Sequence, residues 1–372
     1  MRGLYIHIPF CKKICTYCDF YKRIAGEKLK TKYIDMLLKE IDLKESKFSQ
    51  ISTLYIGGGT PSALGVTLLE RLYDKLSTVL DFKRLEESTI EVNPEDINEE
   101  LVKCLVKYQV KRVSIGVQGF DERKLKILGR NHNYELVSKA VSLLKEHGIT
   151  NINLDLMYGI TGFDLNELDK EIDLFLSLKP THISTYSLQL EPHTILYNQH
   201  LKGKYNLMDE ELESKMYFHI IERLSKANFI HYETSNFALP GNQSAHNLIY
   251  WKNEHYLGLG PSASYYIDDT RYTNTKNLES YFAGVLSGEL FYFEEVVLSK
   301  EDKMNEELIL GLRLIEGVSE KTFFEKYGVS IYDAFPKIES GLERGLLVKK
   351  NGNIAINFPY LYLGNYVLAE IL

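Results

Sequence analysis

The sequence predicts an α/β protein built as a partial or complete (βα) barrel, with a small winged-helix-like module at its C-terminal end. Between the N-terminus and about residue 238, short apolar, β-branched runs alternate with amphipathic helical stretches at least six times. This alternation is typical of parallel strands joined by right-handed crossovers. Near residue 295 it gives way to shorter helices and a small hairpin. We therefore expect a large domain over residues 1–295 and a smaller one over residues 296–372.

The first strand of the large domain is expected at residues 4–9, which are apolar and β-branched, and apolar residues at helical spacing follow it from residue 33 to 41. The later strands are predicted at residues 53–56, 89–92, 112–117, 152–157 and 182–188. Helices are predicted at 66–80, around 101, between the strand at 112–117 and residue 146, at 165–178 and at roughly 209–227. In barrels of this kind, the chemistry gathers at the C-terminal ends of the strands.

The C-terminal module is expected to contain three short helices, at residues 304–314, 320–327 and 331–340, followed by a hairpin with an Asn-Gly-Asn turn at 351–353. Asn-Gly is a preferred sequence for tight hairpin turns. Many winged helices bind DNA, but residues 300–372 hold nine Lys and Arg against eleven Asp and Glu. This net negative charge argues against DNA binding by the module.

The composition is that of a globular protein, with 44% hydrophobic and 26% charged residues among 372. The formal charge of −7 gives no general attraction to nucleic acid or to anionic membranes. No apolar run reaches the ~20 residues of a membrane helix, and the N-terminal residues do not have the pattern of a signal peptide. Three of the four cysteines fall within eight residues, unlike a disulfide framework. We expect a cytoplasmic protein.

Three cysteines, Cys11, Cys15 and Cys18, directly follow the first predicted strand. Thiolates hold iron–sulfur clusters, and three thiolates for four irons leave one iron open, where a bound sulfonium would be cleaved reductively to a carbon radical. Two alternatives remain: a zinc site, for which His7 is the nearest fourth ligand, and purely structural cysteines. The spacing favours a [4Fe–4S] cluster. Cys104, on a predicted helix, is expected to be a core residue.

Polar residues stand at the ends of the next predicted strands. The second strand runs into a Gly-Gly-Gly-Thr sequence at 57–60, whose glycines permit close backbone approach to a ligand. The third ends at Glu91, the fourth at Gln118 with Arg130 and His132 downstream, and the fifth carries Asp155. Each residue alone is more typical of a structural polar group. Their convergence at one end of a barrel predicts a binding site.

Six motifs follow one another along the chain: YIHIPFCxxxCxYC at 5–18, GGGTP at 57–61, ExNP at 91–94, SIGVQ at 114–118, GRxH at 129–132 and DLMYG at 155–159. In this order they resemble the oxygen-independent coproporphyrinogen III oxidase-like branch of the radical SAM superfamily. The resemblance covers nearly the whole chain. It implies a radical SAM (βα) TIM-like barrel that binds a [4Fe–4S] cluster and S-adenosylmethionine (SAM).

The resemblance also implies roles for single residues. Cys11, Cys15 and Cys18 match the cluster ligands. The positions that contact the cluster-bound SAM are matched by Tyr5, Gly58 and Glu91, and those around a second SAM by Tyr17, Gly59, Thr60, Gln118, Arg130 and Asp155. No single catalytic residue is assigned by the match.

Two departures distinguish the chain from the decarboxylating oxidases of this branch. Those enzymes carry a fourth cysteine two residues after the last cluster ligand, where this chain has Phe20, and an N-terminal extension before the first strand. Residues 246–251, HNLIYW, are similar to the HNxxYW motif associated with haem binding in the haem-chaperone branch, the HemW family. Imidazole is a common axial haem ligand. His246 is therefore a candidate haem contact, with a packed structural histidine as the alternative.

The resemblance to the HemW family implies a role in porphyrin metabolism as a haem chaperone, with an intact cluster motif but without oxidase activity. Such a protein would bind haem, a [4Fe–4S] cluster and SAM, and would deliver haem to an acceptor haem protein, for example a membrane-associated respiratory one. Two other functions stay open. One is oxidative decarboxylation of coproporphyrinogen III to protoporphyrinogen IX by a 5′-deoxyadenosyl radical, and the other is a zinc-stabilised binding module. The residues allow a homodimer but do not decide whether one forms, and they do not decide whether SAM is cleaved.

Overall fold

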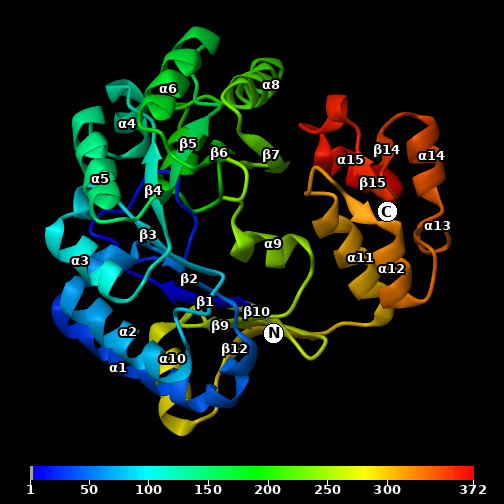
Figure 1. Cartoon of the computed structure of the whole chain (residues 1–372). Coiled ribbons are helices and arrows are strands. Elements are labelled where there is room, and N and C mark those ends of the chain that lie inside the picture. The colour runs from blue at the N-terminus through cyan, green and yellow to red at the C-terminus, as the bar shows by residue number, and fades with distance from the viewer. Residues whose placement is uncertain (1–2) are drawn as a thin grey trace.

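Six parallel strands form the centre of the molecule, in the same order along the sheet as along the chain (Figure 1). The computed structural model describes residues 3–372. The strands are β1 (Gly3–Ile8), β2 (Thr53–Gly58), β3 (Glu87–Val92), β4 (Arg112–Gln118), β5 (Asn151–Tyr158) and β6 (His182–Ser187). The sheet continues into other strands at both edges and does not close on itself. The predicted α/β fold is confirmed, as a partial barrel.

Helices cover the outer face of this parallel sheet (Figure 1). They are α1 (Glu27–Leu43), α2 (Val66–Val79), α3 (Glu99–Lys107), α4 (Glu122–Leu128), α5 (Tyr134–Glu146) and α6 (Leu165–Ser177). Two further helices, α7 (Ile195–Leu201) and α8 (Glu210–Lys226), follow β6 along the chain. Side chains alternate between the two faces of a strand. In β1, the fully buried Leu4, Ile6 and Ile8 belong to the apolar core, whereas Tyr5 and His7 point to the opposite, concave face.

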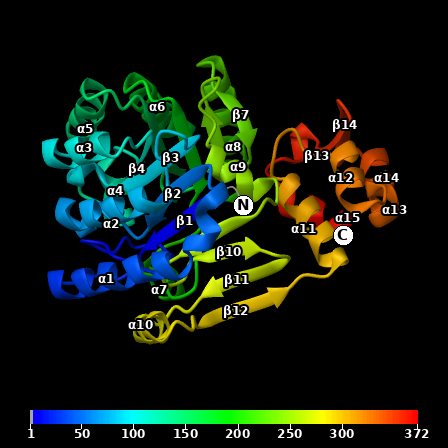
Figure 2. The same cartoon turned by 60° about the horizontal axis from the view of Figure 1, so that its bottom comes forward.

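Residues 230–297 extend the sheet at both edges, and the sequence patterns did not predict this extension. At the β6 edge lie β8 (Asn236–Ala238) and β7 (Ile230–Glu233). At the β1 edge, β9 (Tyr256–Leu259) pairs in parallel with β1, and β10 (Ser264–Ile267), β11 (Thr270–Asn274) and β12 (Tyr292–Val297) continue antiparallel (Figure 2). Strand β12 runs past residue 295, where we expected the large domain to end. Helix α9 (Ala245–Trp251) connects the two edges, and α10 (Leu278–Ser287) precedes β12.

The C-terminal part has a small hydrophobic core of its own, which includes Leu308, Phe323 and Ile354. Its elements are α11 (Lys300–Gly311), β13 (Val318–Ser319), α12 (Glu320–Tyr327), α13 (Ile331–Ala334), α14 (Lys337–Glu343), β14 (Leu347–Lys350), β15 (Asn353–Ile356) and α15 (Gly364–Ile371). The helix predicted at 331–340 is broken because Pro336 disfavours a helical conformation at the residue before it. The predicted hairpin is confirmed, with positive φ at Asn351 and Gly352. No helix within residues 3–372 is long and apolar enough to cross a membrane.

Candidate functional site

The three clustered cysteines lie on the loop after β1 and line one cavity of about 550 Å³, which we call the cluster cavity. Cys11 is buried, and Cys15 and Cys18 are half-buried. Burial, and to a smaller degree the charges of Cys18 and Cys15, raise the pKa of the Cys11 thiol to about 11. Burial also raises the pKa of Cys18. Three neighbouring thiolates are therefore unfavourable here without a positively charged group between them, which is what the irons of a cluster supply.

The zinc alternative fits these residues less well. A structural zinc site takes four protein ligands, whereas the loop supplies three thiols. His7, the fourth ligand considered for zinc, has both ring nitrogens occupied. Its Nδ1 accepts from the Tyr5 hydroxyl at 3.0 Å, and its Nε2 donates to the Tyr21 carbonyl oxygen at 2.8 Å. A [4Fe–4S] cluster needs only these three thiolates, because its fourth iron stays open to another ligand.

Backbone hydrogen bonds fasten the cysteine loop to the rest of the barrel. At its start, Cys11 N donates to the Arg23 carbonyl at 3.0 Å, which closes the loop between β1 and α1 on itself. In its middle, Thr16 N donates to Leu128 O at 3.2 Å, and Thr16 O accepts from Leu196 N at 2.9 Å. The loop is thus held by α4 on one side and by the first turn of α7 on the other. This anchoring fixes where the three thiols can lie.

The structure gives Gly58 and Gly59 a role in close packing, and the expected approach of a ligand to the glycines at 57–59 stays a prediction. Gly58 has a φ of 109°, and a Cβ there would lie 2.6 Å from the His7 ring. A Cβ on Gly59 would lie 2.8 Å from the carbonyl oxygen of Phe10. Both contacts are shorter than real Cβ atoms show. The motif therefore packs the end of β2 tightly against the end of β1 and the start of the cysteine loop.

Glu91 lies at the end of β3 and lines both the cluster cavity and a second cavity of about 730 Å³. We call the second one the tyrosine cavity, because several tyrosines line it, among them Tyr5 and Tyr55. The Oε1 of Glu91 accepts from the Tyr55 hydroxyl at 2.7 Å and its Oε2 from Gly58 N at 3.0 Å. The side chain keeps some surface open to the cavities, but the surrounding protein desolvates it. This burial raises the pKa of Glu91 to about 7.

The raised pKa of Glu91 predicts that Glu91→Gln will flatten the pH dependence of stability. A carboxyl with a pKa of about 7 in the folded state and of about 4.3 in the unfolded state stabilises the fold fully below the lower pKa. This contribution is lost as pH rises through about 7, at a cost of about 2 kcal/mol after solvent screening. Chemical denaturation at several pH values between 5 and 8 measures it.

The control for this prediction is the same substitution at the exposed Glu95. The free energy of unfolding of Glu91→Gln should fall less than that of the wild type on going from pH 5 to pH 8. Glu95→Gln should follow the wild type. Parallel curves for the wild type and Glu91→Gln would contradict the assigned pKa.

The wall of the cluster cavity also carries polar groups with unmet hydrogen-bonding capacity. Arg130 Nη1 donates to Asn93 Oδ1 at 2.9 Å, and Nη2 donates to the Tyr17 hydroxyl at 3.3 Å. The Arg130 Nε and Gln118 Oε1 atoms are buried without a partner among the described residues. Asp155 accepts from Asn153 Nδ2 at 2.8 Å, and burial raises its pKa. Buried polar groups are rarely left unpaired, so this wall fits a polar ligand such as SAM.

The two residue sets predicted for SAM separate into the two adjoining cavities. Tyr5 lines the tyrosine cavity, and Gly58 and Glu91 line both. The set predicted for a second SAM lines the cluster cavity: Tyr17, Gly59, Thr60, Gln118, Arg130 and Asp155. His132 is not among the residues that line these two cavities. It is buried, and its Nε2 bonds to the Gly119 carbonyl. That these residues contact SAM, and which SAM each set contacts, stays a prediction.

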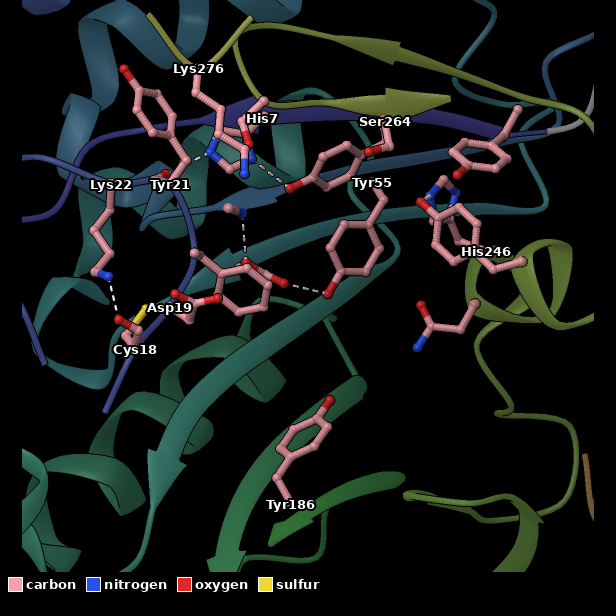
Figure 3. A pocket seen from close by; sticks show the side chains of 18 of the residues that line it. His7, Cys18, Asp19, Tyr21, Lys22, Tyr55, Tyr186, His246, Ser264 and Lys276 are labelled. Atoms are coloured by element: carbon pink, nitrogen blue, oxygen red, sulfur yellow. Dashed lines mark hydrogen bonds between the residues drawn. The ribbon is translucent and has the colours of Figure 1, made fainter. Parts of the chain in front are cut away.

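His246 lies on α9 at the edge of the tyrosine cavity, across the view in Figure 3 from Cys18 and Lys22. Both its nitrogens are engaged, Nδ1 with Thr53 Oγ1 at 2.8 Å and Nε2 with the Tyr250 hydroxyl at 2.7 Å. Burial lowers the pKa of His246 to about 3, so the ring is neutral. Its role as a haem contact stays a prediction, and this geometry favours the structural alternative.

The residues of the tyrosine cavity that the sequence analysis did not single out include Tyr186, His193 and Lys276. Tyr186 stands near the end of β6, where the strand-end rule could have identified it. His193 and Lys276 lie on loops with no motif, so only the tertiary structure identifies them. Cys104 is buried in the core, as expected.

Comparison with known proteins agrees with this geometry. The family model described as the radical SAM superfamily matches residues 5–175, and that described as the HemN C-terminal domain matches residues 298–357. The chain is 38% identical to "Heme chaperone HemW" of Lactococcus lactis subsp. lactis, over 100% of this chain and 97% of the relative. It is 38% identical to the protein of the same name from Bacillus subtilis, over 100% of this chain and 99% of the relative.

A solved structure shares the fold over nearly the whole chain. Coproporphyrinogen III oxidase (HemN) from Escherichia coli, described as a radical SAM enzyme, superposes with a TM-score of 0.85 at 23% identity. The superposition covers 99% of this chain and 89% of that chain. The barrel, its edge strands and the C-terminal module are therefore common to both architectures.

Proposed function

Because the chain belongs to the HemW family of the radical SAM superfamily, we propose that it is a haem chaperone, which binds haem and passes it to an acceptor haem protein. The observation that carries the proposal is the tyrosine cavity, which lies beside the cluster cavity and has a volume within the range of about 300–1,000 Å³ of small-molecule sites. Its walls include the exposed rings of Phe20 and Tyr186. Such walls suit a large, flat, mostly apolar macrocycle.

Phe20 supports the chaperone over the oxidase. It occupies the position at which the oxidases carry a fourth cysteine, it is 69% exposed, and it lines both cavities. A phenyl ring has no acid–base or redox chemistry to offer a porphyrinogen. It offers instead an apolar surface against which a macrocycle can pack.

The cofactors of this proposal are a [4Fe–4S] cluster and SAM. Cys11, Cys15 and Cys18 would hold the cluster, which supplies an open iron for SAM and an electron for reductive cleavage when it is bound. Around it, Glu91 would accept hydrogen bonds from hydroxyl groups of SAM, and Arg130 would balance nearby negative charge. We further propose that the protein acts in the cytoplasm, delivers haem to a membrane-associated respiratory haem protein and forms a homodimer, as the family resemblance implies.

An anaerobic assay tests the chaperone against the oxidase. The reconstituted protein is incubated with SAM and a reductant, either with haem or with coproporphyrinogen III. We expect uptake of haem in proportion to protein and no turnover of the porphyrinogen. Formation of protoporphyrinogen IX at a catalytic rate would overturn the proposal, and so would a failure of the wild type to bind haem.

A further inference from the structure

His193 differs from the other nine histidines of the chain. All ten lie within residues 3–372, and His193 is the only one that is solvent-exposed. Each of the other nine makes a hydrogen bond or a ring contact. His193 makes neither with any residue that the structure describes. Its imidazole therefore keeps a nitrogen lone pair available to a metal ion.

The backbone holds His193 in an unusual conformation. Its φ is 70°, it follows Pro192, and Thr194 N donates to the Glu191 carbonyl at 3.3 Å. Proline followed by a residue with positive φ is the pattern of a type II turn, in which glycine or asparagine is the usual third residue. The buried Thr194 hydroxyl also donates to Glu191 O, at 2.8 Å. Strained positions that their surroundings enforce cluster at binding sites.

The turn that carries His193 is connected to the cluster loop. Both His193 and Thr194 line the tyrosine cavity. Helix α7 begins at Ile195 directly after the turn, and its Leu196 N donates to Thr16 O, between the second and third cysteines of the motif by position. A ligand bound at His193 would therefore contact a segment that is fixed relative to the cluster.

His246 is poorly placed to bind an iron atom. Its two nitrogens are engaged by Thr53 and Tyr250, and its ring stacks on Tyr55 at 5.2 Å between centroids. Coordination through either nitrogen would break a buried hydrogen bond and leave the Thr53 or Tyr250 hydroxyl unpaired. The residues proposed to contact SAM, Tyr5 and Glu91 among them, also line this cavity. They leave its exposed part, rather than its inner wall, for a second ligand.

The exposed residues of the tyrosine cavity suit a flat, anionic ligand. Phe20 and Tyr186 are 69% and 42% exposed and offer ring faces. Lys276, on the loop between β11 and α10, is exposed, and its ammonium lies 4.6 Å from the centre of the Phe293 ring. A lysine in this position can pair with a carboxylate such as a haem propionate. Apolar faces, a cation and a free imidazole thus border one cavity.

From this arrangement we propose that His193 supplies the axial ligand to the iron of bound haem at the exposed part of the tyrosine cavity. His246 supports the inner wall of the cavity without touching the iron. This proposal rests on the haem-chaperone function proposed above. It assigns His193 as a binding residue and His246 as a positioning residue.

The test is haem titration of the full-length, reconstituted protein, followed by visible and electron paramagnetic resonance spectra, which report the axial ligand. We compare the wild type with His193→Asn, His193→Gly and His246→Ala, and with His147→Asn at the end of α5 as a control. Asparagine and glycine both tolerate the backbone of residue 193, so neither variant should disturb the fold. His193→Asn should lose the imidazole signature and bind haem at least about tenfold more weakly, equal to about 1.4 kcal/mol. Free imidazole should restore the signature in His193→Gly.

His246→Ala and His147→Asn should both keep the imidazole signature, whatever the haem affinity of the former. If His193→Asn keeps the wild-type spectrum, the ligand assignment is wrong even though the haem-chaperone function stands. If the wild type itself takes up no haem, the proposed function fails and the assignment fails with it. Binding of haem by the wild type thus separates the two cases.

Discussion

Substituting Cys15 by alanine should leave the protein without its cluster. With Cys15 removed, only the thiolates of Cys11 and Cys18 remain for four irons. We expect the iron and sulfide content to fall from about four of each per chain to near zero after anaerobic reconstitution. The broad thiolate-to-iron charge-transfer absorbance should be lost with it.

Cys104→Ala provides the matched control, because Cys104 is also a free cysteine but lies buried in α3, away from the cluster cavity. This variant should keep the full iron and sulfide content and the absorbance. Zinc in place of iron in the wild type would revive the alternative of a zinc-stabilised module. Retention of the absorbance by Cys15→Ala would show that the assigned cysteines are not the ligands.

Substituting Gly59 by alanine should destabilise the fold and disturb the cluster loop at the same time. The added Cβ would lie 2.8 Å from the Phe10 carbonyl oxygen and 2.9 Å from that of Ile8. These are backbone atoms, and they accept the hydrogen bonds of Thr60 N and Gly59 N at 2.8 Å each. Relief of the clash must therefore move the loop or break these bonds. We expect the free energy of unfolding to fall by about 3 kcal/mol.

Gly26→Ala is the control for Gly59→Ala. Gly26 precedes α1 with a φ of −80°, and a Cβ there would meet nothing within 4 Å. Its free energy of unfolding should stay within about 1 kcal/mol of the wild type. Equilibrium denaturation measures both variants, and iron analysis of Gly59→Ala should show reduced cluster loading. Equal stability of the two variants would mean that the close packing at the end of β2 is not required.

The edge strands show where the sequence patterns stop being informative. Strands β1–β6 were predicted because each combines an apolar run with a following amphipathic helix, which are signals within a short window. Strands β9–β11 have four or five residues each, with Tyr, Ser and Thr among them. Their pairing partners, such as β1 for β9, lie far away in the chain. Such short strands are stabilised by contacts across the sheet, which a local pattern does not contain.

His246 and His193 show the same limit at the site. A motif drew attention to His246, but only the folded structure shows that Thr53 and Tyr250 occupy its two nitrogens. No motif marks His193, and it becomes a candidate because a turn near α7 exposes it at the cavity. Whether a histidine nitrogen is free to bind iron depends on the residues around the ring. Some of those residues, such as Thr53 beside His246, come from segments that are distant in the sequence.

The sequence by itself determined the parallel βα architecture, the cysteine loop after the first strand and the polar residues at the strand ends, because each depends on local periodicity or spacing. Only the tertiary structure decided that Gly58 and Gly59 serve packing against His7 and Phe10. It also decided that the predicted cofactor residues divide between two adjoining cavities with Glu91 between them. The physical reason is that cavities, burial and hydrogen-bond satisfaction arise from segments brought together by folding.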